Sequence, residues 1–277
     1  TNHWAKESIE FVAARGLLNG TGNNKFSPDT SMTRGMFVTA LGRLAGADVS
    51  SYTTSSFTDV KAGSYYLGYI EWASKNGIVN GTGNGKFAPD QSISREQMAV
   101  IMQNYAKVIG FELPKAHAEN TFTDNAKIGS YAKDAVKVMQ MAGVLAGKSG
   151  NKFDPQGTAT RAEVSAVLKR FVELVISTDN AQGWMLNDSG KWMFYENGRP
   201  VTGTKTIDGT SYTFDANGET ADVPKNLTYG TYTVQKVDSF WSIASKYKCS
   251  SFELARINDK SIFSIIHSGD VLKVPEN

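Results

Sequence analysis

Three arginines occupy equivalent places in a repeated phrase and are the residues best suited to binding chemistry. Arg34, Arg95 and Arg161 each follow a serine or threonine, and each lies fourteen residues after a glycine. Serine and threonine favour the position just before a helix, so each arginine falls in a first helical turn, where the helix dipole disfavours a cation. An arginine that is locally unfavourable at three equivalent positions indicates a functional role. Free N–H groups at a helix start, together with a guanidinium, predict a site for a carboxylate or phosphate.

The other interpretation of these arginines is structural, since an exposed arginine could tie its helix to a loop through a salt bridge. The glycines fourteen residues earlier, Gly20, Gly81 and Gly147, permit a positive φ or a close approach of the backbone. They are not phosphate-binding P-loops, because no Gly-Lys-Ser/Thr follows a strand. We assign the arginines and glycines together to candidate ligand-binding grooves.

Two aspartates and a tryptophan are further candidates. Asp59 and Asp124 stand at the start of the second and third repeats, where they could accept hydrogen bonds from sugar hydroxyls or cap a turn. Trp72 lies on a helix where Phe11 and Val138 stand in the other copies. This variability favours core packing, whereas an exposed edge of the ring would suit a sugar face.

The same repeats define the elements that must position these residues. Each copy predicts a first helix, around residues 4–14, 65–75 and 131–141, closed by a glycine. The second helix carries apolar residues spaced i, i+3, i+4, i+7 in every copy. These residues are Phe37, Ala40, Leu41 and Leu44, then Met98, Ile101, Met102 and Tyr105, then Val164, Val167, Leu168 and Phe171. We expect the three stripes to bury against each other as a central three-helix bundle.

The rest of the chain predicts strands and short helices. A polar segment, residues 177–182, precedes alternating aromatic residues that end in Asn197-Gly198 and, twenty positions later, in Asn217-Gly218. Such patterns predict β-hairpins. After a second loop, the last part predicts a βααβ unit. Its strands are expected at 232–236 and 271–274, and its helices at 240–247 and 252–257.

Composition and residue types exclude several functions. Lys+Arg 29 against Asp+Glu 27 leaves a net charge of +2, so no global field attracts nucleic acid, and no apolar run approaches a membrane span of roughly 20 residues. One cysteine, Cys249, excludes an intrachain disulfide, and the three histidines do not stand with it in a nucleophile signature. The candidate carboxylates Asp59, Asp124 and Glu163 lie in different repeats. The sequence therefore predicts no catalysis, no cofactor and no metal site.

Residues 3 to about 175 resemble three S-layer homology domains. Residues 160–163 (Thr-Arg-Ala-Glu) match the signature tetrapeptide of that family fully, residues 94–97 (Ser-Arg-Glu-Gln) nearly, and residues 33–36 (Thr-Arg-Gly-Met) in the first half only. The resemblance implies a pseudo-threefold spindle that anchors exported proteins to secondary cell-wall polysaccharide. Its arginines would engage the pyruvate ketal of a terminal sugar in grooves between adjacent repeats. Because the first copy lacks the glutamate, we expect strong grooves at Arg95 and Arg161 and a doubtful one at Arg34.

Residues 183–220 resemble a degenerate pair of choline-binding or glucan-binding cell-wall repeats. The ligand of such repeats lies between aromatic walls, where tryptophans hold a quaternary ammonium. Trp184 and Trp192 suit a wall, but Thr204 stands where the next tryptophan belongs and Met193 replaces a tyrosine. We favour a short β-spacer over a choline site.

Residues 230–275 resemble a LysM domain in the order and spacing of four segments, at 232–234, 238–244, 257–258 and 267–275. The resemblance implies a shallow groove that binds N-acetylglucosamine-containing glycan. The ligand-binding residues that it implies are Asp238, Ser239, Phe240, Asn258, Ile265 and His267. Val237 replaces the usual glycine before the aspartate.

We therefore expect a multidomain, mainly α protein. S-layer homology repeats are expected at 1–46 (truncated at its N-terminus), 57–111 and 120–176, β-hairpins at 183–220 and a βααβ LysM domain at 230–277. The expected function is non-catalytic anchoring of a monomer to pyruvylated polysaccharide and to peptidoglycan or another N-acetylglucosamine glycan. The expected place is the extracellular wall or S-layer of a Gram-positive-type bacterium. The alternative is the wall-binding tail of a peptidoglycan hydrolase whose catalytic domain is absent from this chain. A lattice-forming protein would need large β-rich domains that this sequence does not contain.

Overall fold

The computed structural model describes residues 3–177, 183–186, 191–222, 224 and 228–276. The chain divides into two compact units, Thr1–Val175 and Ile176–Asn277. Most of the polar segment expected to link them, at 177–182, lies outside the described residues.

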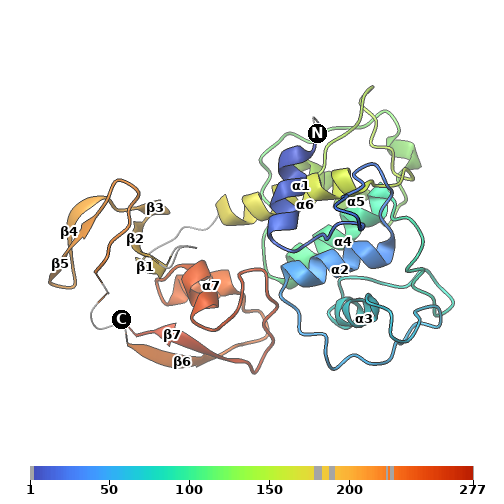
Figure 1. The fold of residues 1–277 in the computed structure, drawn as a ribbon. Coiled ribbons are helices and arrows are strands. Elements are labelled where there is room, and N and C mark those ends of the chain that lie inside the picture. The colour runs from blue at the N-terminus through green and yellow to red at the C-terminus, as the bar shows by residue number, and fades with distance from the viewer. Residues whose placement is uncertain (1–2, 178–182, 187–190, 223, 225–227, 277) are drawn as a thin grey trace. The chain divides into compact units, whose positions relative to one another are not determined.

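The first unit contains three successive helix pairs (Figure 1). The pairs are α1 (Lys6–Ala14) with α2 (Arg34–Leu44), α3 (Leu67–Lys75) with α4 (Arg95–Val108), and α5 (Lys133–Met141) with α6 (Arg161–Ser177), and a short 3-10 helix η1 (Asn125–Lys127) precedes α5. These helices confirm the six predicted from the repeats. The first helix of each pair begins two residues later than expected, and the residue before it makes no side-chain cap.

The apolar stripes of α2, α4 and α6 are buried, as their spacing predicts. None of the twelve stripe residues is more than 7% exposed. Packing also alternates between repeats, because α2 contacts α3 and α4 contacts α5. The second helix of a repeat therefore packs against the first helix of the next repeat, so the three copies share one core.

A ring of backbone hydrogen bonds joins the three repeats just before their second helices. The N–H of Met32 donates to the carbonyl of Ala159 at 2.9 Å, and the N–H of Ala159 donates to Ile93 at 3.1 Å. The N–H of Ile93 closes the ring by donating to Met32 at 2.9 Å. All three residues are buried, so each repeat satisfies polar groups of another.

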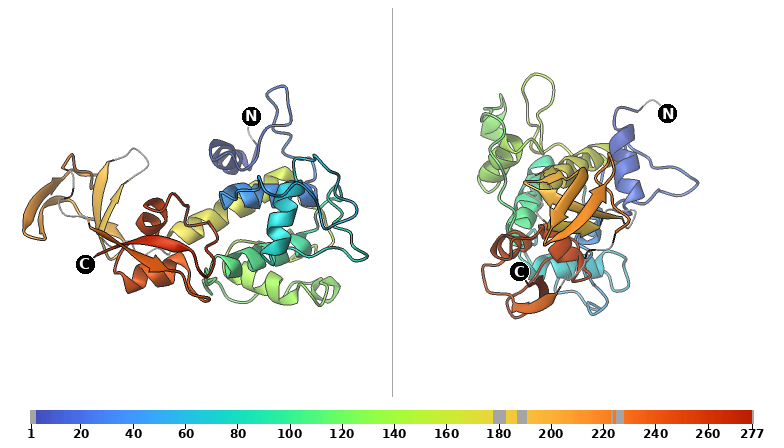
Figure 2. Two further views of the ribbon diagram at one scale, coloured as in Figure 1. Left: turned by 90° about the horizontal axis from the view of Figure 1, so that it is seen from below. Right: turned by 90° about the vertical axis from the view of Figure 1, so that its left-hand side faces the viewer.

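The loop after each first helix reaches away from the helices. Both views of Figure 2 show this loop of the first repeat as a blue arm that follows α1. Within the loop, Gly20 lies so close to the carbonyl of Lys25 that a Cβ would stand 2.9 Å from that oxygen. The equivalent distance from Gly81 to the carbonyl oxygen of Lys86 is 2.6 Å. These glycines close their own loops, which is the close backbone approach expected from sequence.

The second unit begins with small antiparallel sheets. One sheet contains β1 (Gly183–Leu186), β2 (Trp192–Glu196) and β3 (Arg199–Pro200), and the next pairs β4 (Gly203–Ile207) with β5 (Thr210–Phe214). Asn197 and Gly198 both have positive φ between β2 and β3, so the predicted Asn-Gly hairpin turn is confirmed. A second turn of this kind, Asp208-Gly209, joins β4 to β5 and was not among the turns predicted, although Asp-Gly is an equally good signal.

The remainder of the second unit has the predicted βααβ order. Strand β6 (Tyr229–Thr233) pairs antiparallel with β7 (Val271–Pro275), and α7 (Phe240–Lys246) and α8 (Ser251–Arg256) lie between them in sequence. Its core contains Val234, Phe240, Ile243, Ala244, Leu254, Ala255, Leu272 and Val274. This small core holds the two helices against the two-stranded sheet.

Candidate functional site

Each repeated arginine is buried and donates to the loop of another repeat. The Nε of Arg34 donates to the carbonyl of Phe87 at 2.9 Å, and its Nη2 donates to Asn80 at 3.3 Å. Arg95 repeats the pattern one copy further along, with Phe153 at 2.8 Å and Ala146 at 2.6 Å. The arginine of one repeat thus holds the glycine loop of the next repeat.

Arg161 completes this pattern by returning to the first repeat. Its Nε donates to the carbonyl of Phe26 at 2.7 Å and its Nη2 to Asn19 at 2.6 Å. In all three cases the guanidinium also lies over the phenylalanine ring whose carbonyl it binds, 4.4–5.0 Å from the ring centre. Burial lowers the pKa of each arginine below its ordinary value, yet guanidinium groups in proteins stay charged.

The first N–H groups of α2, α4 and α6 already have acceptors, which corrects the prediction of free N–H groups there. In α4 the N–H of Arg95 donates to the carbonyl of Gly157, that of Glu96 to Pro155, and that of Gln97 to the Ser94 hydroxyl. The same three donors are occupied in α2 and α6, by carbonyls of a neighbouring repeat and by the capping threonine. The prediction of free N–H groups was wrong because the sequence alone does not show that a turn of another repeat covers each helix start.

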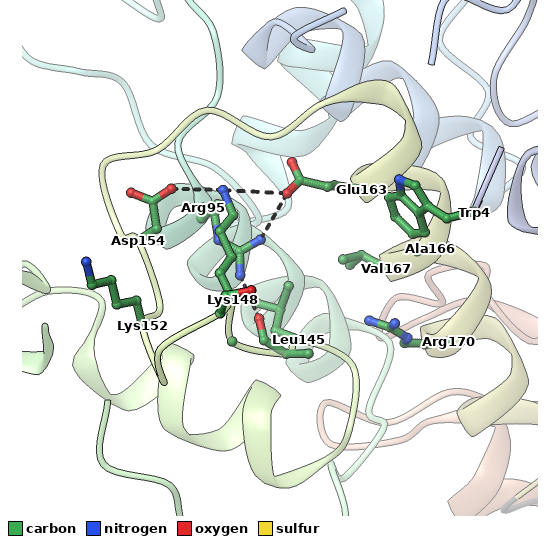
Figure 3. Close-up of a pocket in the computed structure, with 13 residues that line it drawn as sticks. Trp4, Arg95, Leu145, Lys148, Lys152, Asp154, Glu163, Ala166, Val167 and Arg170 are labelled. Atoms are coloured by element: carbon green, nitrogen blue, oxygen red, sulfur yellow. Dashed lines mark hydrogen bonds and ion pairs between the residues drawn. The ribbon is translucent and has the colours of Figure 1, made fainter. Parts of the chain in front are cut away.

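Arg95 nevertheless lines an open groove of about 940 Å³ (Figure 3). The groove is built from three repeats. Its lining includes Trp4 from the first, Arg95 from the second, and Gly147, Lys148 and Glu163 from the third. Figure 3 shows Lys148 and Glu163 close to the Arg95 guanidinium, with Arg170 further along α6. A charged or polar ligand placed here would touch several repeats at once.

Charges inside the Arg95 groove face one another. The Nη1 of Arg95 lies 3.7 Å from the Oε1 of Glu163, and the Nζ of Lys148 lies 3.6 Å from the same oxygen. Lys148 also contacts the carboxylate of Asp154 at 2.8 Å. Arg95 therefore has an ion-pair partner, Glu163, but this glutamate lies on a helix and not on the loop. The arginine is also buried, and its main partners are carbonyl groups.

Arg34 lines a second, smaller groove of about 370 Å³. Its walls include Gly81 and Thr82 from the loop, Gln97 and Asn104 from α4, and Tyr131 from the third repeat. The construction matches that of the Arg95 groove, with one arginine, the loop and helix of the next repeat, and an aromatic residue of the remaining one.

An exposed aromatic residue recurs at one position of each repeat and was missed in the sequence. Trp4 is 66% exposed, and Tyr65 and Tyr131 are each 59% exposed. Each lies twelve residues before the glycine that closes its helix, and this constant spacing was the signal. Trp4 lines the Arg95 groove and Tyr131 the Arg34 groove, and Tyr65 lies close enough to Arg161 for the two to interact electrostatically.

The groove partners remove the reason given for the expected ranking of the three grooves, and the ranking itself stays a prediction. The side chain opposite Arg95 is Glu163 and the one beside Arg34 is Gln97, so each comes from the repeat after the arginine. The cap of α2 is also present, because the N–H of Met36 donates to the Thr33 hydroxyl at 3.2 Å. The missing glutamate of the first copy is therefore no reason to regard the Arg34 groove as the doubtful one.

Asp59 and Asp124 hold turns within their own repeats. The carboxylate of Asp59 accepts from the N–H groups of Phe87 and Ala88, both at 2.8 Å, and Asp124 does the same with Phe153 and Asp154. Partial desolvation opposes ionisation of both aspartates, but these hydrogen bonds to the charged form leave each pKa below its ordinary value. The turn-capping interpretation is confirmed, and a sugar-binding role of these two aspartates stays a prediction.

Trp72 is only 6% exposed and lines neither groove. The structure thus confirms the core-packing interpretation and corrects its assignment as a ligand-binding residue. At the equivalent positions Phe11 and Val138 are half-buried, so burial at this position differs between the repeats.

In the βααβ unit, most residues predicted to bind glycan have structural partners. Phe240 is 1% exposed and belongs to the core, which corrects its assignment to a glycan groove. Ser239 caps α7, and its hydroxyl accepts from the N–H of Ser242. Asp238 accepts from the Tyr232 hydroxyl at 2.8 Å and from the N–H of Gln235 at 2.7 Å.

Asn258 locks α8 to β7. Its Nδ2 donates to the carbonyls of Leu254 and Lys273, and its Oδ1 accepts from the N–H of Lys273 at 2.7 Å. Ile265 is partly exposed and His267 is exposed on the segment before β7. These two side chains are the better placed of the predicted residues to meet a glycan.

The aromatic residues of the hairpins pack together. Trp184 contacts Tyr212, with ring centres 4.6 Å apart, and also Phe194, Phe214 and Trp192. Tyr212 and Phe214 are core residues of this segment. Trp184 therefore supports a small hydrophobic cluster, which agrees better with a β-spacer than with a choline cage.

The parts of the chain that the structure describes contain neither a metal-binding cluster nor a membrane-spanning helix. No three His, Cys, Asp or Glu side chains there come close enough to hold a metal ion. None of its helices has the length and apolar character needed to cross a membrane.

Comparison with known proteins identifies two kinds of domain in this chain. The model of the S-layer homology domain matches residues 1–35, 56–99 and 121–165. The model of the LysM domain matches residues 232–275. The chain therefore carries three S-layer homology repeats and a C-terminal LysM domain, as the sequence motifs predicted. Neither family match covers the hairpin segment at 183–220, so its likeness to choline-binding or glucan-binding repeats is not supported.

Individual relatives share the first part of the chain. An amylopullulanase of Thermoanaerobacterium thermosulfurigenes is 34% identical over 62% of this chain and 9% of its own length. The exoglucanase XynX of Acetivibrio thermocellus is 32% identical over 62% and 16% of the two chains. An S-layer protein of Bacillus thuringiensis subsp. finitimus is 27% identical over 61% and 20%. The chain thus spans a fifth or less of these relatives, and the enzymes among them match through the S-layer homology region. The S-layer homology repeats that this chain shares with S-layer proteins indicate a cell-surface protein with cell-wall-binding modules.

Proposed function

We propose that residues 1–175 form a pseudo-threefold spindle that binds a pyruvylated secondary cell-wall polysaccharide. The observation that carries this proposal is the Arg95 groove, where a buried guanidinium, Lys148 and an exposed Trp4 lie along one open surface. A guanidinium and an ammonium suit the carboxylate of a pyruvate ketal, and an aromatic face suits the apolar face of a sugar ring. The same construction recurs at Arg34 with Tyr131.

The LysM domain supplies a second glycan site in this proposal. We assign it N-acetylglucosamine-containing glycan, with peptidoglycan as the natural source, on the strength of the family match at 232–275 and the exposure of His267. Two weak sites on one chain raise overall avidity by about 10²–10⁴ where the linker lets both engage. The chain then acts as a non-catalytic, monomeric anchor on a Gram-positive-type wall.

The named relatives favour one alternative. Amylopullulanase and exoglucanase XynX share these repeats although they are enzymes. In this alternative the chain is the wall-binding tail of a larger hydrolase, with peptidoglycan as a candidate substrate. The two proposals predict the same polysaccharide binding and differ in the activity of the full gene product, which a zymogram on purified walls measures.

Binding to purified polysaccharide tests the main proposal without involving the LysM domain. Pyruvylated polysaccharide is compared with the same material after removal of its ketals, by isothermal titration calorimetry on the full chain. Because the arginines also hold the fold, the variants replace exposed aromatic residues instead, as Trp4→Ala and Tyr131→Ala. Tyr229→Ala, on β6, is the matched control, since Tyr229 is an exposed aromatic residue of the other unit. Equal binding of both polysaccharides would refute the proposal, as would equal loss in the control.

The LysM assignment is tested separately with an oligomer of N-acetylglucosamine. We expect His267→Ala and Ile265→Ala to weaken binding of this oligomer and to leave binding of the pyruvylated polysaccharide unchanged. Loss of binding to both ligands in either variant would contradict the assignment of two independent sites.

A further inference from the structure

Tyr131, the exposed aromatic residue of the Arg34 groove, is held at its far end by a hydrogen bond. Its hydroxyl donates to Oε1 of Glu96 at 2.8 Å, a contact from the third repeat to the second. Tyr65, at the same position of the second repeat, instead meets the ring of Tyr66, with ring centres 5.0 Å apart. A hydrogen bond to a carboxylate is charge-assisted and directional. This contact therefore fixes the direction of the Tyr131 ring.

The carboxylate that holds this ring is buried, because Glu96 is only 3% exposed. Its Oε1 also accepts from Nε2 of Gln156 at 2.6 Å, and its Oε2 accepts from the N–H of Gly129 at 2.9 Å. Burial of a charge is costly unless hydrogen bonds satisfy it, as they do here. The other repeats have Gly35 and Ala162 at this position, so the repeat fold itself does not need a carboxylate there. The contacts of Glu96 therefore indicate a role particular to this place in the chain.

The backbone of Gly129 bounds the same ring from one side. A Cβ at Gly129 would stand 2.6 Å from Cε1 of Tyr131, so the ring lies where a side chain of residue 129 would have to be. At the equivalent Gly63, two residues before Tyr65, a Cβ would meet nothing within 4 Å. Tyr131 is nevertheless 59% exposed, so much of its surface stays open to a ligand in the Arg34 groove.

We infer that Glu96 is a positioning residue that holds the Tyr131 ring in the Arg34 groove as a preformed face for a sugar ring. This inference rests on the proposed function and deepens it, because it assigns the uncharged part of the glycan to a particular side chain. An aromatic ring suits the apolar face of a sugar. A side chain that is already ordered loses less rotamer freedom on binding, which is worth about two- to tenfold in affinity.

The test uses the full chain and follows the Arg34 groove by NMR. The Nε–H resonance of Arg34 reports binding there, and the three-bond couplings of Tyr131 report the spread of its χ1 angle. The probes are the methyl glycoside of pyruvylated N-acetylmannosamine and the same glycoside without its ketal. The dispersed amide spectrum of each variant shows whether it is folded.

Four variants separate a positioning role from a merely structural one. Glu96→Ala introduces the residue that the third repeat already has at this position, and Glu96→Gln keeps an oxygen for the tyrosine hydroxyl. Tyr131→Phe keeps the ring and removes the hydroxyl. Glu71→Ala is the matched control, since Glu71 is a buried carboxylate of the same repeat, 4% exposed, that accepts from Ser55 and Ser56 and lines neither described groove.

We expect Glu96→Ala to weaken binding of both glycosides at Arg34 about two- to tenfold and to spread the χ1 angle of Tyr131. Glu96→Gln should retain most of the affinity. Tyr131→Phe should lose as much affinity as Glu96→Ala, and the double variant no more than either, because both changes remove the same hydrogen bond. Glu71→Ala should lower stability and leave the affinity at Arg34 unchanged.

Three results would overturn the inference: unchanged affinity in Glu96→Ala, an equal loss in Glu71→Ala, or additive losses in the double variant. The proposed function is decided separately. If the glycoside without its ketal binds as tightly as the pyruvylated one and Glu96→Ala weakens both, the proposed function fails and the inference stands. If pyruvylated polysaccharide binds the chain but neither glycoside shifts the Arg34 resonance, the function stands and the inference fails.

Discussion

Arg161 donates from Nε to the carbonyl oxygen of Phe26, a residue 135 positions earlier in the chain, at a distance of 2.7 Å. This hydrogen bond joins the last S-layer homology repeat to the first. The arginine of the family's signature tetrapeptide therefore has a structural role in this chain whether or not it also contacts a ligand. A loss of binding on mutation of these arginines would not by itself identify a binding residue.

We expect Arg161→Lys to lower the free energy of unfolding of the first unit by about 1–3 kcal/mol. A lysine has one nitrogen on a flexible stem and cannot donate to the carbonyls of Asn19 and Phe26 in one fixed geometry, so a partly buried acceptor loses its partner. Urea unfolding followed by far-UV circular dichroism measures the change. Arg170→Lys, on an exposed part of the same helix, is the control and should change stability by less than about 0.5 kcal/mol. Equal effects would contradict the structural role.

The double variant Asp59→Asn/Asp124→Asn should change the pH dependence of stability. Both carboxylates have a lowered pKa in the fold because backbone N–H groups bind their charged form, despite some desolvation. Their stabilising contribution is therefore present above the ordinary pKa of about 3.9 and is lost as the pH falls through the lowered value. The free energy of unfolding of wild type should exceed that of the variant at neutral pH and approach it in acid. Parallel pH profiles would show that the carboxylates do not clamp these turns.

Local features of the fold were predictable, because their causes lie within a few residues. The apolar stripe of α4 follows from its own periodicity, and its cap follows from Ser94 and Gln97. The partners of the arginines were not predictable in this way. Arg34 and Asn80 are 46 residues apart, and Arg161 and Asn19 are 142 apart, so these contacts depend on how whole repeats pack.

The composition of the grooves was only partly predictable. The constant spacing of Trp4, Tyr65 and Tyr131 was visible in the sequence and would have suggested a recurring surface position. That Trp4 lines the same groove as Arg95 of another repeat was not visible, since nothing local relates them. The burial of Trp72 was not visible in the sequence either. A large aromatic residue in a repeat could be a sugar-binding residue, and only its burial assigns it to the core.

Two tryptophan variants distinguish a residue of the core from a residue of the groove. We expect Trp72→Ala to lower the free energy of unfolding by about 3–5 kcal/mol because it leaves a cavity in the interior. Trp4→Ala, at an exposed position, should change stability by less than about 0.5 kcal/mol and weaken binding of pyruvylated polysaccharide. Unfolding and calorimetric titration are measured on both, with Trp72→Phe as a milder core variant. The opposite pattern, with binding lost only on mutation of Trp72, would restore Trp72 as a ligand residue.

Asn258→Ala should destabilise the LysM domain by about 1–3 kcal/mol, because two carbonyls and one N–H lose their partner together. The amide of Lys273 reports this directly, since its hydrogen bond goes to Asn258 and its hydrogen exchange should accelerate. Asn217→Ala, at an exposed turn of the hairpin segment, is the control. If exchange at Lys273 is unchanged while glycan binding is lost, Asn258 is a ligand residue instead.

The last prediction concerns the wall of the Arg34 groove. Buried Glu96 accepts from the Tyr131 hydroxyl at 2.8 Å and from the N–H of Gly129 at 2.9 Å, and desolvation together with this carboxylate raises the pKa of Tyr131 to about 12. A raised pKa favours the protonated phenol, so its contribution to stability is present below the ordinary pKa of about 10 and is lost as the pH rises through about 12. Glu96→Gln should lower the pKa of Tyr131, measured by NMR of its ζ-carbon, and leave Tyr65 as the unchanged control. An unaltered Tyr131 pKa would mean that Glu96 does not hold this ring in the groove.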